Sequence, residues 1–147
     1  GMARIGATVW TGDINPTWQD LQATPSMILN WGLAGAPYVA CDIGGFTGET
    51  TAPLLTRWMQ AGTFFPTMRV HSTKEATPHF PFLWDEPYAS AMREALNWRM
   101  RLLPYHYSLA HAMYAKPGTL WLRPLVAAFP DDASVVQSEL THEWLDG

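Results

Sequence analysis

The sequence is short of charge and holds a single cysteine. Charged residues make up 15% of its 147 residues, and the formal net charge is -4. Nucleic-acid binding is not expected, because a phosphate backbone calls for clustered Lys and Arg. Cys41 alone cannot form an internal disulfide framework. No apolar run approaches the length of a membrane span and no leader-like segment opens the chain, so neither a membrane segment nor a signal peptide is expected.

Tryptophan, by contrast, is abundant. The chain has eight, and hydrophobic residues make up 48% of it, enough for a packed core at this length. Tryptophan concentrates where flat apolar faces meet ligands or partners, and the C–H faces of sugars are such surfaces. A tryptophan-rich core explains the count equally well, so the positions have to decide between the two interpretations.

A strand, a loop and a helix recur three times. Strands are expected at 6–10, 37–41 and 63–69, and helices at 25–31 (with Thr24 as N-cap), 51–60 and 85–115, the last interrupted at Pro104. This alternation predicts an α/β fold with a parallel sheet. Three units cannot close a barrel of eight, so residues 1–117 are predicted to be the C-terminal portion of a (β/α)8 barrel whose N-terminal part lies outside this sequence.

The pattern changes after Lys116-Pro117-Gly118. Residues 120–129 resemble strands of a different unit. Residues 118–147 are therefore predicted to begin a following β-rich domain, with 139–147 ending in mid-pattern.

Three predicted strands deliver ionisable groups at their C-terminal ends, where barrel enzymes keep their active residues. These groups are Asp13, Asp42 and His71. Each has an ordinary alternative, since Asp is common in turns, where it bonds its own backbone, and most histidines are structural. Three such groups at equivalent positions favour a site, and Asp13 with Asp42 could be the paired carboxylates of glycoside cleavage.

Six motifs then occur in order: Trp10-Thr11-Gly12-Asp13, Cys41-Asp42-Ile43-Gly44-Gly45-Phe46, Arg57-Trp58-Met59-Gln60-Ala61-Gly62, Phe65-Pro66-Thr67-Met68-Arg69-Val70-His71, Leu102-Leu103-Pro104-Tyr105 and Arg123-Pro124-Leu125. Together they closely resemble glycoside hydrolase family 31, the α-glucosidase and α-xylosidase family. The resemblance runs from Arg4 to about Phe129.

The resemblance implies a retaining mechanism and assigns roles by position. Asp13 matches the general acid/base. Asp42 matches a residue of the sugar pocket and is not the nucleophile, which replaces the pairing of Asp13 with Asp42 considered above. His71 matches a residue that binds substrate hydroxyls. Two further matches, Trp10 and Phe46, are aromatic walls of the pocket. Arg69 matches a residue that supports those touching the sugar.

The family's nucleophile segment has no counterpart in this sequence. The expected function is therefore a fragment of a retaining α-glycoside hydrolase that acts on terminal α-linked sugars in an oligosaccharide or α-glycoside. The alternatives are a non-catalytic fragment with at most weak sugar binding, or an α-xylosidase or transglycosylase of the same family. No cofactor is expected, and no metal, since His106 and His111 lack a third ligand at suitable spacing. The aromatic loop 79–84 departs from the family pattern and is expected to shape the outer pocket.

Overall fold

Three parallel extended segments form the centre of the fold. In the computed structural model, which describes residues 7–137 and 144–146, β1 (Val9–Trp10) pairs in parallel with β2 (Val39–Ala40). Two parallel bridges, Ala40 to Thr67 and Ile43 to Val70, place the third segment on the other side of β2. The segments lie side by side in chain order, as in a barrel, which confirms the predicted parallel α/β arrangement.

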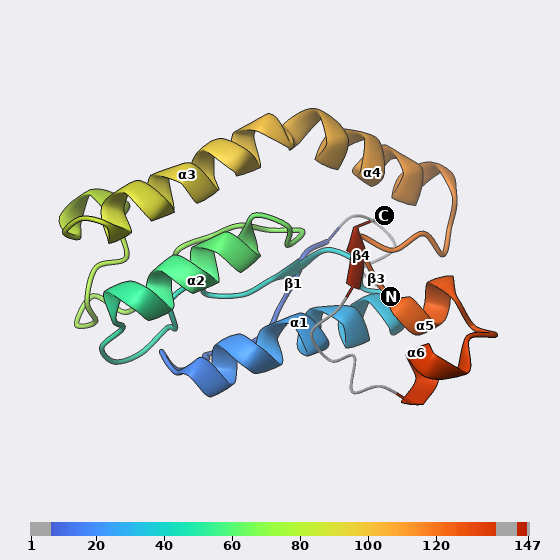
Figure 1. The fold of residues 1–147 in the computed structure, drawn as a ribbon, viewed down its shortest axis with the longest axis horizontal. Coiled ribbons are helices and arrows are strands. Elements are labelled where there is room, and N and C mark those ends of the chain that lie inside the picture. The colour runs from blue at the N-terminus through green and yellow to red at the C-terminus, as the bar shows by residue number, and fades with distance from the viewer. Residues whose placement is uncertain (1–6, 138–143, 147) are drawn as a thin grey trace.

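Helices connect these segments and cover them. They are α1 (Trp18–Leu33), α2 (Ala52–Gly62), the short 3-10 turn η2 (Pro81–Leu83), α3 (Tyr88–Arg101) and α4 (Leu103–Ala115). Figure 1 shows α3 and α4 running on from one another as a long bent rod. The bend falls where the sequence predicts it, because Pro104 in the first turn of α4 has no N–H to give to α3.

Helix α1 begins earlier than the sequence analysis placed it. The prediction took Thr24 as N-cap and Pro25 as the first helical residue, and it was wrong. Thr17 is the N-cap: its Oγ1 accepts from the backbone N–H of Asp20 at 3.0 Å and donates to the Asp20 carboxylate at 2.8 Å. The Asp20 carboxylate also accepts from the backbone N–H of Asn15 at 3.2 Å. These bonds stabilise the first turn upstream of Pro25, so the helix carries Pro25 in its interior.

The core lies between the strands and helices α2 and α3. Val39, Cys41 and Ile43 on the second strand have no exposed surface, nor do Trp58 of α2 and Met92 of α3. Ala40, between Val39 and Cys41, is buried as well, so both faces of the segment are covered there, as the apolar sequence at 37–41 predicts.

The C-terminal part contains less strand than predicted. Only β3 (Leu122–Pro124) is extended within 120–129, and it pairs antiparallel with β4 (Trp144–Asp146). Residues Leu125–Ala128 form α5 instead, followed by α6 (Ala133–Gln137). A short apolar run fits a strand or a helix equally well, and periodicity cannot separate them. Most of the predicted unit at 139–147 lies outside the described residues.

Within the described ranges, the helices are too short or too polar to cross a membrane.

Candidate functional site

The ends of the three parallel segments meet around one carboxylate. Trp10 Nε1 donates to Asp42 Oδ2 at 3.2 Å. The Arg69 guanidinium forms an ion pair with Asp42 Oδ1 from the other side. The backbone N–H of Ile43 donates to the carbonyl of Arg69 at 3.1 Å, which brings the two loops together. The convergence of strand ends that the sequence predicts is therefore present for Trp10, Asp42 and Arg69.

Asp42 itself is completely covered. Its side chain has no exposed surface, whereas that of Arg69 is 44% exposed and Trp10 is 45% exposed. A sugar hydroxyl oxygen is about the size of a water molecule, so oxygens that water does not touch have no room to accept a bond from a sugar. In this structure the Asp42 carboxylate instead holds Trp10 by a hydrogen bond and Arg69 by an ion pair. Its predicted direct contact with sugar would need the loop to move.

Three aromatic rings form a row along the same edge. The centroids of Trp10 and Phe46 are 6.4 Å apart, with the rings edge to face. Phe46 and His71 stack at 5.2 Å with an angle of 26°. Trp10 and His71 are exposed and Phe46 is half-buried, so the row, here called the aromatic wall, presents aromatic surface to solvent.

Asp13 lies in the loop after β1 with its side chain exposed. The structure gives its carboxylate no hydrogen bond or ion pair among the described residues, so the ordinary role of bonding its own turn is not seen here. The loop around it is nevertheless fixed. Ile14 is buried, and its carbonyl accepts from the N–H of Phe46 at 2.7 Å. The exposed carboxylate of Asp13 is therefore carried by an anchored stretch of backbone.

Gly45 allows the two loops to approach. A Cβ added at Gly45 would lie 2.4 Å from the backbone nitrogen of Pro16, closer than any real contact. Gly45 also has a φ of +89°, which L side chains rarely adopt. The glycine-rich sequence after Asp42 thus has a steric reason: it lets the loop of Phe46 lie against the loop of Asp13.

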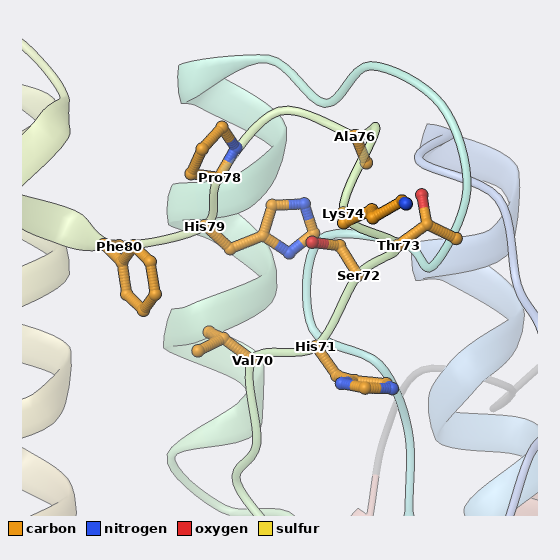
Figure 2. Close-up of a pocket in the computed structure, with 9 residues that line it drawn as sticks. All are labelled: Val70, His71, Ser72, Thr73, Lys74, Ala76, Pro78, His79 and Phe80. Carbon is orange, nitrogen blue, oxygen red and sulfur yellow. The ribbon is translucent and has the colours of Figure 1, made fainter.

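The segment from Val70 to Phe80 lines an open pocket of about 350 Å³, formed by residues 70–74, 76 and 78–80. In Figure 2 the imidazole of His79 points into the space beside Ser72, and that of His71 points away from it. His79 is only 4% exposed, and burial lowers its pKa. The sequence analysis did not single it out, since a lone histidine in a Pro-rich loop carries no pattern.

The loop predicted to shape the outer pocket does present aromatic surface. Phe80 and Phe82 stack at 5.5 Å and are 52% and 77% exposed.

Other candidate groups lie elsewhere. Burial raises the pKa of the Cys41 thiol to about 12, so it is an inert core group. His106 is buried, its ring 5.2 Å from that of Trp121, while His111 is exposed. No three His, Cys, Asp or Glu side chains gather as a metal would require in the part of the chain that the structure describes.

Comparison with known proteins places this geometry in a family. Residues 1–109 match the model described as "Glycosyl hydrolases family 31 TIM-barrel domain". The chain is 42% identical to lysosomal alpha-glucosidase of Rattus norvegicus over 125 residues, which are 85% of this chain and 13% of that protein. It is 38% identical to neutral alpha-glucosidase AB of Dictyostelium discoideum over 135 residues, 92% of this chain and 14% of that protein.

Solved structures agree. A glucosidase II alpha subunit superposes with a TM-score of 0.88 at 34% identity, over 94% of this chain and 14% of that one. A GH31 alpha-xylosidase from a soil metagenome, complexed with xylose, gives 0.85 at 31% identity, over 95% and 24%. The chain thus spans 13–14% of the length of the curated relatives named above.

Proposed function

This chain belongs to glycoside hydrolase family 31 as part of its TIM barrel, and we propose that it supplies the acid/base side of an active site that hydrolyses terminal α-linked sugars. The observation that carries the proposal is the arrangement of the strand ends. An exposed carboxylate, Asp13, lies on a loop anchored to Phe46, beside an aromatic wall of Trp10, Phe46 and His71.

Asp13 is proposed as the general acid/base. In the first step it gives its proton to the glycosidic oxygen as the bond to the anomeric carbon breaks and a nucleophilic carboxylate takes that carbon. In the second step it takes a proton from the water that displaces the nucleophile. The nucleophile would come from a part of the barrel that this sequence does not contain, about 5 to 5.5 Å from Asp13 in a retaining enzyme.

The aromatic wall is proposed to hold the sugar. The C–H bonds of a sugar ring can pack against the flat faces of Trp10 and Phe46, and the ring nitrogens of His71 can form hydrogen bonds with hydroxyls. Asp42 and Arg69 are proposed to support the wall. The buried carboxylate holds the indole N–H of Trp10 and one end of Arg69, whose exposed remainder is open to a ligand.

The test is Asp13→Asn in the complete enzyme. Asparagine keeps the size of the side chain and cannot exchange the proton, so kcat on natural glycosides should fall about 100- to 10,000-fold. Aryl glycosides with good leaving groups should suffer less in the first step, because their leaving oxygen needs little protonation. Asp131→Asn, also exposed, is the matched control and should leave kcat unchanged. A near-normal kcat for Asp13→Asn would refute the assignment.

A second function follows from the absence of a nucleophile segment in the sequence. We propose that the 147-residue chain alone hydrolyses nothing and at most binds sugar weakly through the aromatic wall. Hydrolysis of a chromogenic α-glucoside by the purified chain would contradict this. Two alternatives remain for the complete enzyme. One is α-xyloside hydrolysis, since a relative was solved in complex with xylose, and the other is transglycosylation, which uses the same acid/base. Product analysis with glucosides and xylosides distinguishes α-glucosidase, α-xylosidase and transglycosylase activity.

We also propose that the barrel portion ends near residue 117 and that 118–147 begin a β-rich domain. Support comes from the family model, which stops at 109, and from the antiparallel pair β3/β4.

A further inference from the structure

The loop of residues 42–46 carries both Asp42 and Phe46, and its backbone is held at each end. The N–H of Ile43 donates to Arg69 at 3.1 Å. At the other end the N–H of Phe46 donates to Ile14 at 2.7 Å, and the Phe46 carbonyl accepts from Thr73 at 2.9 Å. All these partners are backbone groups, as are those of the bond within the loop, in which the N–H of Gly45 donates to the carbonyl of Asp42 at 3.0 Å. A side chain also packs against the loop between its two ends.

That side chain is His79. Its imidazole faces the backbone of Ile43, and this interaction raises the His79 pKa against the larger, opposite effect of burial. Its Cε1 and Nδ1 atoms also lie so near Gly44 that a Cβ there would be 2.7 and 2.8 Å away. Gly44 has a φ of +95° and is buried, so the ring rests directly on glycine backbone. A planar ring packed against a residue without a side chain restrains the loop at Gly44, and the interaction with the Ile43 backbone adds to this restraint.

The imidazole makes no other polar contact that could explain its burial. Nδ1 has no hydrogen-bond partner among the described residues, although the side chain is only 4% exposed. Burying such a group costs free energy. The contact of the ring with the Ile43 and Gly44 backbone is therefore the feature that accounts for a histidine at this position.

We propose that His79 is a positioning residue: by holding Ile43 and Gly44 it keeps Asp42 under Trp10 and Phe46 between Trp10 and His71, and so maintains the aromatic wall. The inference rests on the proposed function only in taking this wall as the surface that meets sugar. His79 touches neither the wall nor Asp13 through any bond in the structure, so it acts through the loop.

The test monitors the position of Trp10 in the aromatic wall by NMR, using the 147-residue chain without any sugar. The indole N–H of Trp10 gives one cross-peak in a ¹H–¹⁵N spectrum, identified by its loss in Trp10→Phe. Because that N–H bonds Asp42, its position reports the geometry of the loop. In His79→Leu, which removes the ring N–H, the Trp10 peak should shift by more than its line width. His79→Gln, which keeps an N–H donor, should restore most of the wild-type position.

Two controls separate positioning from stability. His111→Leu removes an exposed histidine of α4 and should leave the Trp10 peak in place. The unfolding midpoints of the Leu and Gln variants should both fall, since both lose the ring. If His79→Leu does not fold, His79→Phe keeps a ring, lacks the donor and replaces it in the comparison. A Trp10 peak that stays in place in the folded donor-less variant overturns the proposal.

The two proposals fail separately. A shifted Trp10 peak together with a fully active Asp13→Asn enzyme would leave His79 as a positioning residue and remove the acid/base assignment. An unmoved peak with an inactive Asp13→Asn enzyme would do the reverse.

Discussion

The indole nitrogen of Trp10 donates to Oδ2 of Asp42 at 3.2 Å, joining the ends of two neighbouring parallel strands. The donor belongs to a ring that is 45% exposed and the acceptor to a residue with no exposed surface. A buried charge therefore sets the orientation of a ring that solvent, or a ligand, can reach. The same carboxylate pairs with Arg69, so a single residue links groups from all three segments.

Removing Arg69 from its ion pair with Asp42 should lower the free energy of unfolding more than removing Asp42 does. Arg69→Leu leaves a covered carboxylate without its cation, and the free energy of unfolding should fall by about 3–5 kcal/mol. Asp42→Asn leaves an arginine that is 44% exposed and can turn to solvent, so about 1–3 kcal/mol is expected. Urea denaturation of the 147-residue chain measures both. Equal losses, or a larger loss for Asp42→Asn, would mean that Asp42 is not buried as described.

Gly45→Ala should be worse than Gly12→Ala, although both glycines have nearly the same φ, +89° and +90°. Backbone strain costs each variant about 1–3 kcal/mol. A Cβ at Gly12 meets nothing within 4 Å, while one at Gly45 meets the backbone of Pro16 at 2.4 Å. The collision should add about 1–3 kcal/mol or more for Gly45→Ala. Denaturant midpoints of the pair give the difference directly, and equal midpoints would show that the two loops do not touch.

Arg99 should contribute strongly to the stability of the fold by holding the chain that leads into the third segment. Its guanidinium donates to the carbonyls of Thr63, Phe65 and Pro66 at 2.6–3.1 Å. Arg99→Met should lower the free energy of unfolding by on the order of 3 kcal/mol, because partly buried carbonyls lose a charged donor. Arg93→Met, on the exposed side of the same helix, should change it by less than about 0.5 kcal/mol. Thermal unfolding of both variants tests this, and similar midpoints would contradict it.

His106 should make the chain less stable in mild acid. Burial, with a smaller contribution from Arg99, lowers its pKa from 6.5 to about 4 in the folded protein. As the pH falls from 6.5 to 4, the unfolded chain takes up a proton that the folded chain refuses, so the free energy of unfolding decreases. One pKa unit is about 1.4 kcal/mol, so the decrease attributable to His106 is at most about 3 kcal/mol.

The comparison that isolates this effect uses His106→Leu, with His111→Leu as the exposed control. Between pH 7 and 4 the wild type and His111→Leu should lose more stability than His106→Leu. Parallel pH dependences in all three proteins would show that His106 is not buried in its neutral form.

The alternation of elements determined much of the fold. Apolar patterns and the chemistry of proline act locally, and they predict the buried strand around Val39–Cys41, the helices at 51–60 and 85–115, and the break at Pro104. The start of α1 was missed although Thr17 and Asp20 carry a helix-start signal, because the Thr24-Pro25 pair offered a competing start. The helix at Leu125–Ala128 could not be told from a strand, since four apolar residues fit either.

For the site, the strand pattern by itself determined that Asp13, Asp42 and His71 stand at strand ends, because parallel strands deliver their C-terminal residues to one edge. The resemblance of the motifs to a family added Trp10, Phe46 and Arg69. Only the tertiary structure decided which of them are reached by solvent. It covered Asp42 and left Trp10 and Arg69 exposed, and it brought His79 onto Gly44. Burial and contact between distant residues depend on how the loops pack on one another, and a linear pattern contains no record of that packing.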